Sequence, residues 1–218
     1  MILSLGDWVL AEACRICATW QQPGQPPVRV AVNVSPLQFN QPGYFERLTS
    51  ILDASGLDPA LLTLEITEGV LMQAGKEAHE LLARIRNLGV RIALDDFGTG
   101  YSSLSYLTDL PADVIKLDRT FLQHCSTHAM TVIGAVITMA HHLGLEIVAE
   151  GVETGEQKRA LDDLMCDQFQ GYYFSPPVSA DNAAEMLQQP GRESSWEQSI
   201  RSLARKIGQT APEPASAL

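Results

Sequence analysis

The strongest constraint on the fold of this chain is a repeated alternation of short apolar stretches with amphipathic segments. Six apolar stretches have the length and composition of strands: 28–35, 61–68, 90–98, 113–119, 145–153 and 166–175. Segments with helical periodicity lie between most of them: 44–55, 69–88, 128–143 and from Thr154 onward. The stretches are too apolar for a sheet with one solvated face, so this order predicts a parallel sheet covered by helices.

Polar residues lie near the C-terminal ends of five of these stretches: Asn33, Glu65, Asp95, Lys116 and Glu150. The residues two positions earlier, on the same face of each strand, are small or medium in size. Polar side chains that point inward at successive strand ends build the active face of a (β/α) barrel. A flat doubly wound sheet instead gathers its site at one switch point. The pattern therefore favours a barrel.

The number of strands is smaller than a closed barrel requires. A (β/α)8 barrel has eight strands, whereas this chain offers six, and residues 3–20 have the periodicity of a helix. We therefore expect an α/β protein with a TIM-like (β/α)8 barrel, incomplete here with about six of eight strands, and with two strands' worth of chain missing at the N-terminus.

The composition changes after residue 188, which predicts a division into residues 1–188 and an appendage at 189–218. The appendage places four apolar residues at helical spacing: Trp196, Ile200, Leu203 and Ile207. Such a helix either docks on the barrel or serves in dimerisation. The final GQTAPEPASAL has the composition of a disordered tail.

Charge and cysteine usage limit the functions that the chain can have. The net charge of −11 argues against wrapping a DNA or RNA polymer or binding an anionic membrane surface. It leaves an anionic substrate open, because metal ions invert the local field. Four scattered cysteines and no visible secretory signal predict a cytoplasmic protein with reduced thiols. The three-residue spacing of Cys14 and Cys17 is that of one helical face, so we do not interpret the pair as a metal site.

Oxygen donors predominate among the predicted strand-end residues. Asn33, Glu65, Asp95 and Asp96 suit Mg²⁺ or Mn²⁺ rather than zinc. Two adjacent aspartates can serve two metal ions about 4 Å apart. Strand-end caps and salt bridges would explain one or two of these residues, but not the aligned set. Lys116 would offset the negative charge, pair with an aspartate, or do both.

Six stretches in this order resemble the signature motifs of the EAL-domain family of cyclic di-GMP phosphodiesterases: VNVSPLQF, LEITE, DDFGTGYSSL, IKLDRTF, VAEGVE and QGYYFSPP. With WVLAEAC near the start, the resemblance covers about residues 2–187. It implies a (β/α)8 barrel that hydrolyses cyclic di-GMP to linear pGpG with two Mg²⁺ or Mn²⁺ ions.

The resemblance also implies a role for each residue. The metal ligands would be Asn33, Glu65, Asp95 and Asp96, with Asp95 bridging the two ions. Lys116 would position the attacking water, and Glu150 would be the general base or its metal-side partner.

Three further residues would complete the site. Glu68 resembles the family glutamate that holds the DDFGTGYSS loop, and Glu153 and Gln170 would lie at its rim near the substrate. Family members also suggest a homodimer and an upstream sensor or GGDEF domain.

One departure from the family leaves the activity open. The Glu-Ala-Leu motif, which supplies another metal-ligating glutamate, and the arginine after it do not occur in this sequence. We therefore expect an N-terminally truncated member, either a phosphodiesterase that this loss impairs or a non-catalytic cyclic di-GMP receptor or regulatory protein. A different metal-dependent barrel enzyme, such as an enolising one, fits the six ordered motifs poorly.

Overall fold

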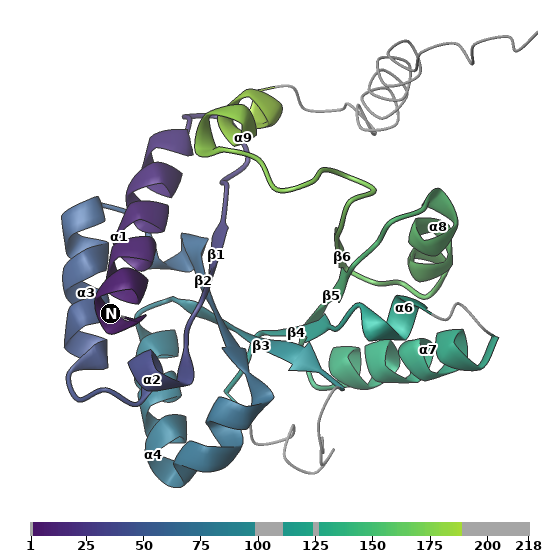
Figure 1. The fold of residues 1–218 in the computed structure, drawn as a ribbon, viewed down its shortest axis with the longest axis horizontal. Helices are drawn as coiled ribbons and strands as arrows, with labels where there is room; N and C mark the ends of the chain where they lie inside the picture. The colour runs from purple at the N-terminus through teal and green to yellow at the C-terminus, as the bar shows by residue number, and fades with distance from the viewer. Residues whose placement is uncertain (1, 99–110, 124–126, 189–218) are drawn as a thin grey trace, which may run out of the picture.

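The centre of the molecule is one sheet of six parallel strands. The computed structural model describes residues 2–98, 111–123 and 127–188. The strands follow each other in sequence order: β1 (Val30–Asn33), β2 (Leu62–Thr67), β3 (Arg91–Phe97), β4 (Val114–Leu117), β5 (Glu146–Glu150) and β6 (Gln168–Gln170). The sheet curls into a half-barrel that is open between β1 and β6, as expected for six strands of a TIM-like barrel (Figure 1).

Helices connect the strands and cover the outside of the curl (Figure 1). The longer ones are α1 (Ile2–Trp20), α3 (Tyr44–Ser55), α4 (Glu68–Asn87), α7 (Thr127–His142), α8 (Gly155–Asp163) and α9 (Ala180–Leu187). Short turns of helix occur at α2 (Pro36–Phe39), η1 (Pro59–Leu61) and α6 (Thr120–Gln123). Capping boxes begin α2 at Ser35 and α8 at Thr154, because each hydroxyl accepts an amide hydrogen that the first turn leaves unpaired.

The strands are staggered in the way that a barrel requires. Asn33 pairs with Glu65, but Glu65 pairs with Ala93, two residues before Asp95. The stagger recurs at β5, where Lys116 pairs with Val148, two residues before Glu150. Each step of two residues keeps the same face inward while the strands tilt around the barrel axis.

The hydrophobic core lies between the sheet and the helices. The outward residues of the strands are buried, with Leu64 and Ile115 fully inaccessible. They pack with helix residues such as Leu82 of α4 and Ile133 of α7, which are also fully buried. Full burial of such a side chain contributes about 1.5–3 kcal/mol, so this layer supplies the main stabilisation and leaves the concave face for polar groups.

Aspartates tie the strands together at the N-terminal end of the sheet. Asp113 precedes β4, and its Oδ2 accepts the Ile92 amide at 2.9 Å while its Oδ1 accepts Arg86 Nη2 at 2.7 Å. Asp167 precedes β6 and accepts the Ile147 amide at 2.8 Å. Each carboxylate thereby satisfies the amide of the second residue of the preceding strand.

The six predicted strands are confirmed, with two differences in detail. β6 is shorter than the predicted 166–175, because a turn begins at Gly171. Helix α9 was not predicted. The expected helix and tail at 189–218 lie outside the described residues. Among the described helices, none has the length and apolar character that a membrane span requires.

Candidate active site

A buried lysine forms the centre of the C-terminal end of the sheet. The Lys116 ammonium donates to three carboxylates from three other strands: Glu65 Oε2 at 2.8 Å, Asp95 Oδ1 at 2.8 Å and Glu150 Oε1 at 2.6 Å. Burial alone lowers the pKa of Lys116, but these three hydrogen bonds outweigh it and raise the pKa above its ordinary value. Lys116 is therefore a permanent cation at neutral pH.

The site holds more carboxylates than cations, and the pKa values of two of its acids are raised. Burial raises the pKa of Glu65, and the hydrogen bond from Lys116 offsets only part of that effect. The pKa of Asp96 is also raised, first by burial and then by the negative charges of Asp95 and Asp118. Glu65 and Asp95 are buried whereas Asp96 is exposed, and the excess negative charge of this partly buried site would be relieved by a further cation.

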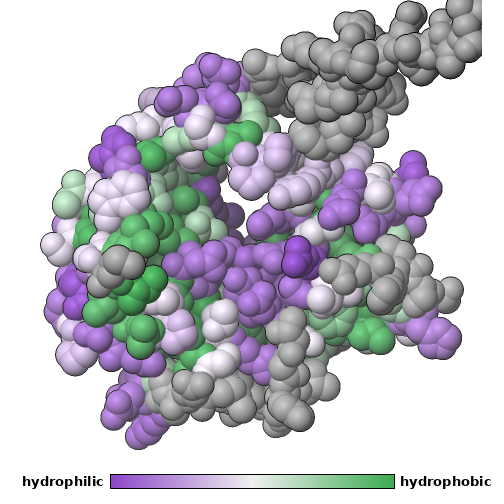
Figure 2. Space-filling view, viewed as in Figure 1, coloured by the Kyte–Doolittle hydropathy of each residue, from purple (hydrophilic) through white to green (hydrophobic). Residues whose placement is uncertain are grey.

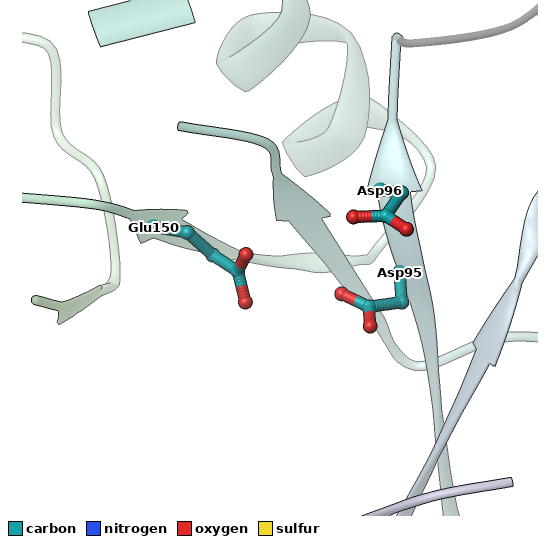
Figure 3. Close-up of side chains that lie close together, drawn as sticks. All are labelled: Asp95, Asp96 and Glu150. Atoms are coloured by element: carbon teal, nitrogen blue, oxygen red, sulfur yellow. The ribbon is translucent and has the colours of Figure 1, made fainter. Parts of the chain in front are cut away.

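Three of these carboxylates are close enough to bind one metal ion. Asp95, Asp96 and Glu150 each offer an oxygen, and the three oxygens lie within 4.8 Å of one another. Figure 3 shows Asp95 and Asp96 at the end of β3, with the carboxylate of Glu150 extending toward them from β5. A site of oxygen donors alone fits a hard cation such as Mg²⁺ or Mn²⁺.

The backbone at Asp96 makes this arrangement possible. Neighbouring residues of a strand normally point to opposite faces. Asp96 has φ +54, in the left-handed region, which aspartate tolerates better than most residues. This turn brings its carboxylate to the side of Asp95. Strand periodicity alone would have separated the two acids.

The other predicted metal ligands lie on the adjoining strands. Asn33 and Glu65 are register partners at the ends of β1 and β2. Glu65 is buried, whereas Asn33 is exposed on the edge strand. Both therefore line the end of the sheet at which the acidic cluster lies, but only Glu65 contacts Lys116 among the described pairs.

The predicted rim residues are placed as follows. Gln170 pairs with Glu150 across β5 and β6, and it lines a pocket of about 170 Å³ with Glu65 and Lys116. Hydrophilic residues gather in this hollow (Figure 2). Glu153 is exposed, and its amide donates to Gln157 Oε1 at 2.7 Å. Glu68 begins α4, but most of the loop that it was expected to hold, at 99–110, lies outside the described residues.

Sequence reasoning missed one acidic neighbour of the site. Asp118 lies two residues after Lys116, and its charge contributes to the raised pKa of Asp96. Its Oδ1 accepts the Thr120 amide at 2.9 Å, which fixes the carboxylate at the start of α6. Asp118 follows Lys116 by two positions in IKLD. Residues two apart along an extended chain point to the same side, so this spacing could have indicated Asp118.

Comparison with known proteins gives the family. The model of the EAL domain matches residues 1–177, most of the chain.

The chain belongs to the EAL domain family.

Its relatives include a Pseudomonas aeruginosa protein named cyclic di-GMP phosphodiesterase NbdA, 41% identical over 86% of this chain and 24% of NbdA. The EAL-domain chain spans about a quarter of the length of the curated relatives that it matches.

Solved structures agree in fold. The structure of the MucR phosphodiesterase in complex with cyclic di-GMP has a TM-score of 0.79 and 38% identity, over 84% of this chain and 74% of that one. A Klebsiella pneumoniae BlrP1 complex with manganese and cyclic di-GMP has a TM-score of 0.72 and 30% identity, over 81% of this chain and 45% of that one. The predicted family and barrel type are thus confirmed.

Proposed function

We propose that this EAL domain hydrolyses cyclic di-GMP to linear pGpG with two Mg²⁺ or Mn²⁺ ions. The observation that carries the proposal is the convergence of Asp95, Asp96 and Glu150 within 4.8 Å beside the Lys116 ammonium. Relatives named cyclic di-GMP phosphodiesterases, and a neighbour solved with manganese and cyclic di-GMP, support it.

The chain's own residues have distinct roles in this reaction. The metal ions, when bound, neutralise the phosphodiester and lower the pKa of the attacking water. Asp95, Asp96, Glu65 and Asn33 would hold them, and the protonated Lys116 would orient the water for in-line attack on phosphorus. Glu150, on the metal side of the site with Asp95 and Asp96, would accept the proton of this water as one ester P–O bond breaks, and the ribose oxygen would leave as a hydroxyl with a proton from solvent. Gln170 and Glu153 contact the substrate at the rim.

A direct assay tests the proposal. The chain, with Mn²⁺ and cyclic di-GMP, should release pGpG, resolved by chromatography, and Glu150→Gln should lower the rate by at least about 100-fold. Glu156→Gln, an exposed carboxylate in the first turn of α8, is the matched control and should retain the wild-type rate. No pGpG above the Glu150→Gln background would contradict hydrolysis.

A non-catalytic cyclic di-GMP receptor or regulatory protein is the second candidate, because the pocket lined by Lys116 and Gln170 could bind a nucleotide without turnover. Calorimetry separates the two functions. Micromolar binding of cyclic di-GMP without turnover supports a receptor, whereas the absence of any binding excludes both.

The proposal also covers the domain division of the chain, the neighbouring domains of the whole protein and its oligomeric state. Residues 1–188 would fold as the EAL unit, with residues 189–218 as an appendage. The bifunctional diguanylate cyclase/phosphodiesterase MucR, a relative that is 40% identical, supports a GGDEF or sensor domain elsewhere in the whole protein. We also propose a cytoplasmic homodimer, which light scattering would test.

A further inference from the structure

We propose that the segment after Lys116, residues 118–122, is a wedge that sets the spacing between Asp95 and Asp96 on one side and Glu150 on the other. The inference rests on the proposed function, because this spacing matters when the carboxylates share metal ions. The two sides come from β3 and β5, which are separated by β4. Their ends need a support that contacts both, and the continuation of β4 provides it.

The first contact of the wedge is with the end of β3. Gly98 follows Asp96 by two residues and has φ +94. A Cβ at this position would lie 2.3 Å from Phe121 Cζ and 2.4 Å from its Cε2. The Phe121 ring therefore occupies the space that a side chain would fill, and it rests on the backbone that carries Asp95 and Asp96.

The second contact is with the end of β5. Gly151 directly follows Glu150 and has φ +68. A Cβ here would lie 2.4 Å from Arg119 Cβ and 3.3 Å from its Cα. The wedge therefore lies against the backbone that carries Glu150, with no room for one additional carbon atom.

A hydrogen-bonded side chain joins the same two segments a second time. Gln157 Nε2 donates to the Leu122 carbonyl at 3.3 Å, while Gln157 Oε1 accepts the Glu153 amide at 2.7 Å. The loop after Glu150 is thus attached to the end of the wedge by a hydrogen bond as well as by packing.

The wedge is itself a rigid turn. The Asp118 carboxylate accepts the Thr120 amide at 2.9 Å, and the Asp118 carbonyl accepts the Phe121 amide at 3.1 Å. The Arg119 carbonyl accepts the Leu122 amide at 2.9 Å, and the Leu122 side chain is buried. Because the turn is fixed internally, a displacement at either glycine changes the distance between the carboxylates. Displacements of about 1 Å at such sites are costly to function.

Alanine substitutions at the two glycines test the wedge through Mn²⁺ affinity, measured by calorimetry and by the Mn²⁺ electron paramagnetic resonance spectrum of the folded chain. Gly98→Ala and Gly151→Ala should each weaken Mn²⁺ binding by about 10-fold or more. Gly144→Ala is the matched control, because Gly144 also has a positive φ, +73, but has no atom within 4 Å of its Cβ position. It should bind Mn²⁺ within about 2-fold of the wild-type chain.

A compensating change separates the wedge from general loss of stability. Phe121→Ala in the Gly98→Ala background reopens the space, so the double variant should bind Mn²⁺ more tightly than Gly98→Ala alone. Should Gly98→Ala fail to fold by circular dichroism, Phe121→Ala alone should still weaken Mn²⁺ binding and alter the resonance spectrum, since it removes the support of β3.

Three results would overturn the wedge: glycine variants that bind Mn²⁺ like Gly144→Ala, a double variant no tighter than Gly98→Ala, or a Phe121→Ala chain with wild-type affinity. A wild-type chain that binds Mn²⁺ but does not hydrolyse cyclic di-GMP overturns the proposed function alone. A chain that binds no Mn²⁺ overturns both.

Discussion

At the residue scale, the site is a balance between one buried cation and a surplus of acids. Lys116 is 4% exposed and contacts three carboxylates, and among the ion pairs of the described residues it is the positive partner of Glu65, Asp95 and Glu150. The hydrogen bonds to Lys116 balance part of the negative charge, and a divalent cation would relieve the excess that remains.

Removal of the cation should therefore be costly. We expect Lys116→Met to lower the free energy of unfolding of the metal-free chain by about 3–5 kcal/mol, because two buried carboxylates and the half-buried Glu150 lose their counter-charge. Mn²⁺ should restore part of this loss. Urea denaturation measures both effects, with Lys76→Met as the control, since Lys76 is 91% exposed in its pair with Glu80. Equal stability of the two variants would contradict this account.

Removal of one acid should instead raise the free energy of unfolding. Burial raises the pKa of Glu65 above its ordinary value of 4.5, so folding disfavours its charged form. Its contribution to stability is fully present below pH 4.5 and is lost as the pH rises through the folded-state pKa. Glu65→Gln should thus stabilise the metal-free chain by about 1 kcal/mol at pH 7.

Thermal denaturation at pH 7 and at pH 4 measures this effect, which should shrink at the lower pH. The same Glu65→Gln variant should bind Mn²⁺ more weakly than the wild-type chain, since it loses an anionic ligand. A Glu65→Gln chain that is less stable than the wild type at pH 7 would contradict the conclusion that folding disfavours the charged form of Glu65.

At the element scale, the two ends of the sheet have different tasks. The C-terminal ends of the strands carry the acids of the site, whereas Asp113 and Asp167 join neighbouring strands at the N-terminal ends. This division matches the general separation of function and stability in (β/α) barrels.

Because the two ends of the sheet have different tasks, a substitution of Asp113 should affect stability and not metal binding. Asp113→Ala removes the acceptor of the Ile92 amide and the partner of Arg86, so the free energy of unfolding should fall by about 1–3 kcal/mol. Mn²⁺ affinity should stay unchanged, because the residue lies at the end of the sheet opposite the site. Asp162→Ala is the control, since its pair with Lys158 lies on the surface of α8 and is worth about 0.5 kcal/mol. A marked loss of Mn²⁺ affinity in Asp113→Ala would show that the two ends are coupled.

At the scale of the whole molecule, the proposed metal ions join parts of the half-barrel that do not pair directly. Asp95 and Asp96 end β3 and Glu150 ends β5, while β4 lies between them. A ligand that binds the folded chain but not the unfolded one stabilises the whole fold by mass action. Metal binding should therefore be visible as global stabilisation.

We expect Mn²⁺ at 100 times its dissociation constant to stabilise the chain by about 2.7 kcal/mol, and a chelator to reverse this. Differential scanning calorimetry measures the shift. The double variant Asp95→Asn/Asp96→Asn should lose the shift, and Asp162→Asn should keep it. An equal shift in all three chains would indicate binding elsewhere.

Local sequence patterns were enough to predict the number and order of the strands, the faces that they bury and the end of the sheet at which the acids gather. These features follow from local periodicity, which each segment carries in its own residues. Helix α9 was missed because its eight residues are too few for periodicity alone to distinguish a helix from a loop. The family motifs in turn indicated which strand-end residues to consider.

The way in which those residues meet depends on the folded molecule. Asp96 lies beside Asp95 because of its left-handed backbone, which strand periodicity does not encode. Lys116 contacts acids from β2, β3 and β5 because the stagger of the half-barrel brings residues from different register levels together. The closeness of Asp118 to Asp96, and the seating of the wedge on Gly98 and Gly151, depend on packing between segments that are distant in sequence. Such contacts are properties of the folded molecule, since no single segment contains both partners.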